Sequence, residues 1–179
     1  MGKVIIVAMF PVTEYDIEKY LTEKKQKEIL SRIQRALNYN KELVIRDVHL
    51  VMNDKISVDE EGYTSSTNLV MGRYCPNEKE IKINKEVVGK KVNELSNQEY
   101  DKFFNREGYL FCDLIFIHEC AHAYQDQLCG RIMKKDDQVL EKEANDIVTK
   151  VFMKTYECKM EIKEKIITYY NSMVKSCSL

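Results

Sequence analysis

The sequence predicts an α+β domain in which a few strands come first and helices follow. Runs rich in β-branched residues lie in the first half of the chain, whereas apolar residues spaced by three and four dominate the second half. The length of 179 residues is enough to bury one core and too short for two independent ones. We therefore expect a single domain over residues 1–179.

The first half is expected to contain four strands at most. An apolar run at 4–10 predicts a buried first strand, because it ends without the cleavage site of a signal peptide. A second strand is expected over Leu43–Met52, followed by an exposed polar loop at 53–62. The runs 67–74 and 80–84 flank the sequence CPNEK, which is typical of a hairpin.

Helices are expected before and after these strands. Two precede most of the strands, one at 17–21 behind a cap at Thr13 or Asp16 and one along 29–37. Four helices are expected later in the chain. The first starts at Ser96, which forms a capping box with Glu99, and the second runs from Tyr109 to Cys129, before Gly130. The third runs from about Gln138 to Tyr156, and the last along Ile162–Met173.

Composition and charge limit the classes of partner. The 28 basic residues nearly balance the 29 acidic ones, so the chain has no electrostatic footprint for nucleic acid or for an anionic membrane. We find no stretch apolar enough to span a bilayer. The six cysteines are scattered without a C-x-x-C pair, which predicts free thiols in a cytoplasmic protein. The oligomeric state stays open.

The segment FIHECAHAYQD, within the helix expected at 109–129, indicates a metal site. His118 and His122 are four residues apart, so they project from one helix face and can reach the same ion. Glu119 is turned by about 100° from His118, which suits a general base that reaches the attacking water. An apolar stripe beside the histidines points them into the fold: Leu110, Leu114, Ile117, Ala121, Tyr124 and Leu128. The alternative is that core hydrogen bonds satisfy both histidines.

A catalytic zinc site needs three protein ligands, and the next helix offers the sequence EKEAN at 141–145. Glu141 lies near the edge of the buried face of this helix, so it is the expected third ligand. Glu143 points away but stays a candidate. Asn145, or Asp146 in its place, is a candidate partner for the N–H of a ligating imidazole. Cys120 faces away from the site and is expected to be a packed thiol.

HECAH at 118–122 followed by ExxAN at 141–145 resembles the gluzincin branch of the zincin metallopeptidases. The resemblance covers about a quarter of the chain, with a weaker likeness at Gly72–Asn84, where small zincins often place a strand beside the active-site helix. It implies a small zincin-like domain, in which a few-stranded mixed sheet with a hairpin packs on the HExxH helix and further helices follow.

The resemblance also implies Zn²⁺ held by His118, His122 and Glu141. Glu119 would accept a proton from the attacking water and pass it to the leaving amine. The implied function is a cytoplasmic zinc metallopeptidase acting on a peptide or protein substrate.

Several details of this function stay open in the sequence. An extended peptide could add to the strand near Met71–Tyr74, or the hairpin could merely cover the core. Four side chains are possible oxyanion donors: Tyr74, Tyr109, Tyr124 and His49. The alternatives to this peptidase are a zincin-like binding or regulatory module without proteolytic activity, and a toxin or effector metalloprotease.

Overall fold

A computed structural model describes residues 16–38, 42–52, 70–96, 108–129 and 137–177 of the chain. These residues form six helices and one small mixed sheet, which confirms the α+β class. The strand expected at 4–10, the possible cap Thr13, the loop at 53–62 and the helix expected after Ser96 lie outside the described residues.

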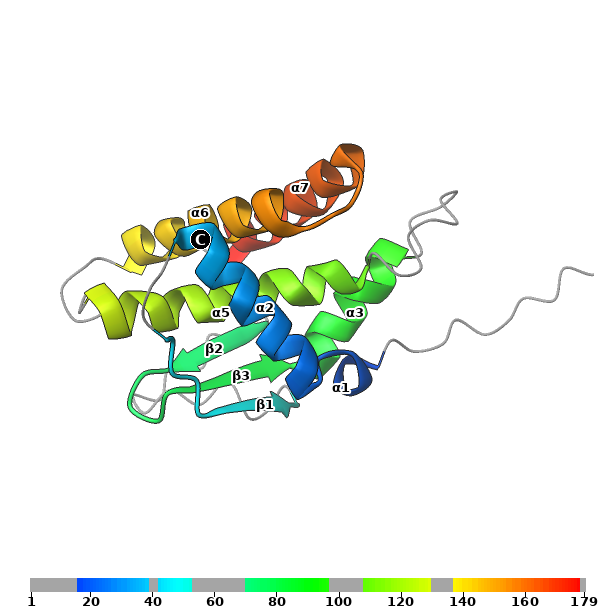
Figure 1. The fold of residues 1–179 in the computed structure, drawn as a ribbon. Helices are drawn as coiled ribbons and strands as arrows, with labels where there is room; N and C mark the ends of the chain where they lie inside the picture. Colours follow the sequence, from blue (N-terminus) through cyan, green and yellow to red (C-terminus); the bar gives the residue numbers. More distant parts are fainter. Residues whose placement is uncertain (1–15, 39–41, 53–69, 97–107, 130–136, 178–179) are drawn as a thin grey trace, which may run out of the picture.

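The elements are layered around one long helix, α5 (Tyr109–Cys129). Figure 1 shows the sheet on one side of α5, with α6 (Asp137–Thr155) and α7 (Met160–Cys177) on the other. The bounds of α5 match the sequence prediction, and those of α6 differ from it by one residue at each end. α6 runs back along α5, so the second half of the HExxH helix faces the start of α6.

The sheet contains β1 (Asp47–Val51), β2 (Gly72–Cys75) and β3 (Glu80–Asn84) in the order β1-β3-β2. β2 and β3 form the expected antiparallel hairpin, and β1 pairs in parallel with β3. β1 is shorter than the strand expected over 43–52. Its predicted start does not pair with a strand, because the side-chain amide of Gln127 bonds both the N–H and the carbonyl of Val44, at 2.9 and 2.7 Å.

Two helices precede the sheet, and a polar side chain begins each of them. α1 (Ile17–Tyr20) starts at Asp16, whose carboxylate accepts hydrogen bonds from the N–H groups of Glu18 and Lys19. α2 (Glu23–Leu37) starts at Thr22 and ends at Asn38, which has the left-handed conformation with φ of 51°. Asp16, one of the two caps considered for the first helix, is therefore its N-cap.

A helix at Lys85–Ser96, α3, was not expected from the sequence. Asn84 ends β3 and caps this helix, because its side-chain oxygen accepts a hydrogen bond from the N–H of Val87 at 3.2 Å. The sequence did not predict this helix because three of its residues have low helix propensity: Val87, Val88 and Gly89. Burial of Val88 and Val92 outweighs that propensity.

Helix α5 is buried on almost all sides, which corrects the expectation of a single apolar stripe. Phe111, Cys112, Phe116 and Cys120 lie outside that stripe and are all fully buried. A helix that is apolar all round belongs in the middle of a fold, and α5 contacts the sheet as well as α2, α3, α6 and α7. None of the helices in the described ranges is both long and apolar enough to cross a membrane.

A buried carboxylate of α5 joins α1, α2 and the residue that follows α6. Asp113 of α5 accepts hydrogen bonds from the hydroxyls of Tyr20 and Tyr156, at 2.8 and 2.9 Å, and lies 3.1 Å from the ammonium of Lys25. Burial, opposed by Lys25 and the two hydroxyls, raises the pKa of Asp113. The contacts fix α1, α2 and the C-terminal end of α6 against α5 on the N-terminal side of the HExxH motif.

Candidate metal centre

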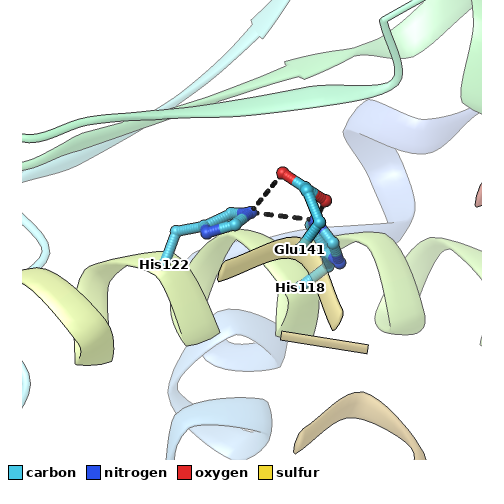
Figure 2. Close-up of side chains that lie close together, drawn as sticks. All are labelled: His118, His122 and Glu141. Atoms are coloured by element: carbon cyan, nitrogen blue, oxygen red, sulfur yellow. Dashed lines mark hydrogen bonds and ion pairs between the residues drawn. The ribbon is translucent and has the colours of Figure 1, made fainter. Parts of the chain in front are cut away.

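The two histidines of the motif and one glutamate of the next helix converge on one point. Figure 2 shows the side chains of His118 and His122 projecting from α5 toward the carboxylate of Glu141. The Nε2 atoms of the two imidazoles are 3.0 Å apart, and each lies 3.2 Å from an oxygen of Glu141. One candidate ligand atom from each residue lies within 4.8 Å of the other two.

The ring of His118 is held from behind by the last helix. Its Nδ1 lies 2.7 Å from the hydroxyl of Tyr170, and that hydroxyl donates to the side-chain oxygen of Asn145 at 2.7 Å. A hydroxyl has only one hydrogen, so the oxygen of Tyr170 accepts from Nδ1–H of His118. This leaves the lone pair of His118 on Nε2, which faces Glu141.

The ring of His122 is also held through its Nδ1 atom, but by a different residue. Its Nδ1 lies 2.9 Å from the side-chain oxygen of Gln125. The amide nitrogen of Gln125 donates to the carbonyl of Leu140 at 2.9 Å, and because a carbonyl can only accept, this contact fixes which end of the amide faces the ring. Nδ1 of His122 is therefore the donor, and its Nε2 lone pair faces the site.

These side chains could hold a metal ion, and their donor set is one that zinc uses. Two Nε2 lone pairs and a carboxylate point at one another, an arrangement that is repulsive unless a cation or a proton lies between them. Two imidazole nitrogens and one carboxylate oxygen are the protein ligands of a common catalytic zinc site. Hydrogen bonds that orient the far nitrogen of each ring are the usual support for such ligands.

The charges of the site act on one another. Burial opposes ionisation of Glu141, but hydrogen bonds and charge interactions with His118 and His122 outweigh it and lower the pKa of Glu141. Burial likewise opposes protonation of His122, yet its contact with Glu141, the charge of Glu119 and the bond to Gln125 raise the pKa of His122. The site therefore favours a positive charge beside a carboxylate.

Glu119 is the buried acidic group beside these ligands. It is 5% exposed, and burial raises its pKa, opposed by the charges of His118 and His122. It is not among the grouped ligand atoms, as expected for a residue one position further round the helix. A carboxylate with a raised pKa next to a cation site is suited to accept a proton during a reaction.

The remaining sequence candidates are placed differently. Glu143 does not belong to the group of ligand atoms, and Asp146 is exposed. Asn145 bonds no imidazole directly, which corrects the expected role, because the longer side chain of Tyr170 lies between the amide and His118. Cys120 is fully buried, so it is the packed thiol that the helix geometry predicted.

Two residues of the site were missed in the sequence. Gln125 carried a usable signal, because it lies three positions after His122 on the same helix and can reach its ring. Tyr170 carried none, since it is 52 residues from His118 and reaches it only because α7 packs against α5.

A second possible group of metal ligands lies on the sheet. Asp47, His49 and Glu80 have ligand atoms within 4.8 Å of one another, and His49 is 3.2 Å from Glu80. The parallel register places Asp47 opposite Glu80, with the side chains of Asp47 and His49 exposed. Exposed acidic groups gather commonly without an ion, so the half-buried site on α5 and α6 is the stronger candidate.

Comparisons of this chain with protein-family models, with curated proteins and with solved structures found no match. A function for this chain is therefore argued from the geometry of its side chains.

Proposed function

We propose that this chain is a zinc-dependent metallopeptidase of the gluzincin type, with a zincin-like arrangement of sheet and active-site helix. One observation carries the proposal. The Nε2 atoms of His118 and His122 and the carboxylate of Glu141 converge, while both Nδ1 atoms are already engaged by Tyr170 and Gln125. Core histidines could reach this arrangement only by sharing a proton, whereas a bound cation satisfies both lone pairs and the carboxylate together.

In this proposal His118, His122 and Glu141 hold the ion. Zinc, when bound, acts as a Lewis acid that polarises a carbonyl and lowers the pKa of a water toward about 7. The carboxylate of Glu119 accepts a proton from the attacking water and returns it to the leaving amine. Tyr170 and Gln125 keep each imidazole in the tautomer that presents Nε2, so the ligands are oriented before the ion arrives.

We propose a peptide or protein substrate, the class that the resemblance to the gluzincins implies. The 44% exposure of the Glu141 side chain, against 12% and 16% for the two histidines, gives the ligand cluster one open side. We also propose a reducing compartment, the cytoplasm, which is supported by the free thiols of Cys75, Cys112 and Cys120.

The experiment that tests this proposal measures zinc content and cleavage of a peptide library together. Wild type is expected to bind one zinc per chain and to cleave peptides, whereas Glu119→Gln keeps its zinc and its fold but loses about 100-fold or more of the activity. The matched control is Asp146→Asn, an exposed carboxylate of α6 that is not a ligand. Wild type that binds zinc without cleaving any peptide would favour a binding or regulatory module instead.

A further inference from the structure

Strand β2 contacts the side chain of Glu119, the general base of the proposed reaction, at Gly72. A Cβ atom built on Gly72 would lie 2.6 Å from Oε1 of Glu119, 2.9 Å from Cγ and 3.0 Å from Cδ. Real Cβ atoms essentially never approach another heavy atom so closely. Gly72 pairs regularly with Ile83 in the hairpin, so close approach, and not an unusual backbone conformation, is what requires glycine here.

The backbone of the same strand also presents an N–H group to the carboxylate. The N–H of Asn84 donates to the carbonyl of Met71, so residues 71 and 84 are a bonded pair of the hairpin. Bonded and non-bonded pairs alternate in an antiparallel ladder, which turns the N–H of Tyr74 away from β3. That N–H instead faces the carboxylate of Glu119, where its interaction opposes the rise in the pKa of that group.

The side chain of Tyr74 fixes this part of β2 to α5 at a second point. Its hydroxyl donates to Asp126 at 3.0 Å and accepts from the amide of Gln127 at 3.1 Å. Asp126 lies seven residues after Glu119, about two turns further along the helix. The strand is therefore fastened to α5 at Glu119 and again about two turns later, and its position relative to Glu119 is set.

We propose that Gly72 and the N–H of Tyr74, here named the β2 cradle, position the carboxylate of Glu119 for its role as general base. The inference rests on the proposed function for that role. The missing Cβ of Gly72 makes room for the side chain, and the N–H of Tyr74 sets the rotation of the carboxylate. The cradle also uses an N–H that an added peptide strand would need, so a peptide cannot pair with β2 at Tyr74 in this conformation.

The first test is made on the zinc-free protein and uses no activity. Amide hydrogen exchange is measured at Tyr74, with Arg73 as the internal control because its N–H belongs to a bonded pair with Lys82. In Glu119→Ala, exchange at Tyr74 is expected to speed up about tenfold or more, while exchange at Arg73 is unchanged. Equal exchange at Tyr74 in wild type and Glu119→Ala would overturn the cradle, whatever the protein hydrolyses.

The second test asks whether Gly72 acts through Glu119. In Gly72→Ala the flexible end of Glu119 gives way more easily than the strand, so the protein is expected to fold and bind zinc but to lose about 100-fold in peptide hydrolysis. The matched control is Arg73→Ala, whose side chain lies on the opposite face of β2. Its hydrolysis is expected to stay near wild type.

A rescue variant separates positioning from a general effect on the fold. Aspartate at position 119 is one methylene shorter and leaves room for a Cβ on residue 72. The Gly72→Ala substitution is therefore expected to cost much less activity in the Glu119→Asp background than in wild type. An equal loss in both backgrounds would overturn the positioning role. If wild type hydrolyses no peptide while Glu119 still protects the Tyr74 amide, the cradle stands and the proposed peptidase function fails.

Discussion

Nε2 of His118 and Nε2 of His122 lie 3.0 Å apart, and a hydrogen bond holds each ring at its other nitrogen. With Nδ1 as the donor on both rings, two lone pairs face each other beside a carboxylate. In the metal-free protein one proton on Nε2 can bridge this gap, and the raised pKa of His122 reflects its stabilisation by Glu141. A divalent cation would take the place of that proton, which makes the site measurable without any knowledge of the substrate.

Removal of zinc from the proposed site is expected to destabilise the protein. At free zinc about 1,000 times the Kd, binding stabilises the folded state by about 4 kcal/mol, or about 8 to 16 °C in Tm for a chain of this size. Thermal unfolding with zinc and with a chelator measures the difference. His122→Ala should abolish it, whereas His49→Ala, which alters the exposed group on β1, should keep it. A His122→Ala variant that responds to zinc like wild type would exclude this site.

Tyr170→Phe is expected to weaken zinc binding about 10- to 100-fold, because Nδ1 of His118 loses the acceptor that orients it. The phenyl ring keeps the packing of a fully buried side chain, so the fold should survive. Competition with a coloured chelator measures the affinity.

Tyr169→Phe is the matched control for this change. Tyr169 is the preceding residue of α7, and its hydroxyl bonds Glu94 at 2.9 Å, away from the histidines. Its affinity for zinc should equal that of wild type. Equal losses in both variants would show that hydroxyls of α7 affect the metal only through general stability.

The helix and its ligands could be predicted because their geometry is local. Residues four apart on a helix share a face whatever surrounds them, so His118 and His122 could be assigned together. Glu141 required only one further step, the phase of the next amphipathic helix, whose buried residues Leu140 and Ala144 flank it. The structure brings these three side chains together as the spacing indicated.

The contacts that could not be predicted depend on packing between distant elements. Tyr170 reaches His118 because α7 returns along α5, and Gly72 approaches Glu119 because β2 lies on the same helix. The spacing of apolar residues in α7 and β2 predicts the elements themselves, but it does not predict how close they lie to the HExxH motif. The helix α3 was missed for a related reason, since burial against the core overrides the low propensity of Val87 and Val88.

Asp113→Ala is expected to destabilise the fold by about 3 to 5 kcal/mol, because it leaves Lys25 and two buried hydroxyls without their shared acceptor. Denaturant unfolding measures the change in free energy. Asp146→Ala, which removes an exposed carboxylate on α6, should stay within about 0.5 kcal/mol of wild type. The metal affinity of folded Asp113→Ala should be unchanged, since none of its partners touches the histidines. A stability loss under about 1 kcal/mol would mean that, in the variant, water replaces Asp113 as the hydrogen-bond partner of Lys25 and the two hydroxyls at little cost in free energy.

The stabilisation by zinc is expected to grow as the pH rises from 6 to 8. The folded pKa of His122 is raised, so in the metal-free protein its contribution to stability is complete below its unfolded pKa of about 6.5 and is lost as the pH rises through the folded value. Zinc binds the neutral ring, so below the folded pKa each binding event releases a proton and affinity rises up to about tenfold per pH unit. The Tm of the metal-free protein should therefore fall as this contribution is lost, over the same pH range in which the zinc-induced increase in Tm grows.

Unfolding scans at pH 6, 7 and 8 with and without zinc measure both trends, and His49→Gln is the control in which both trends should persist. A zinc-induced shift that is the same at all three values would mean that no proton leaves when the metal binds, and His122 would then not be a ligand.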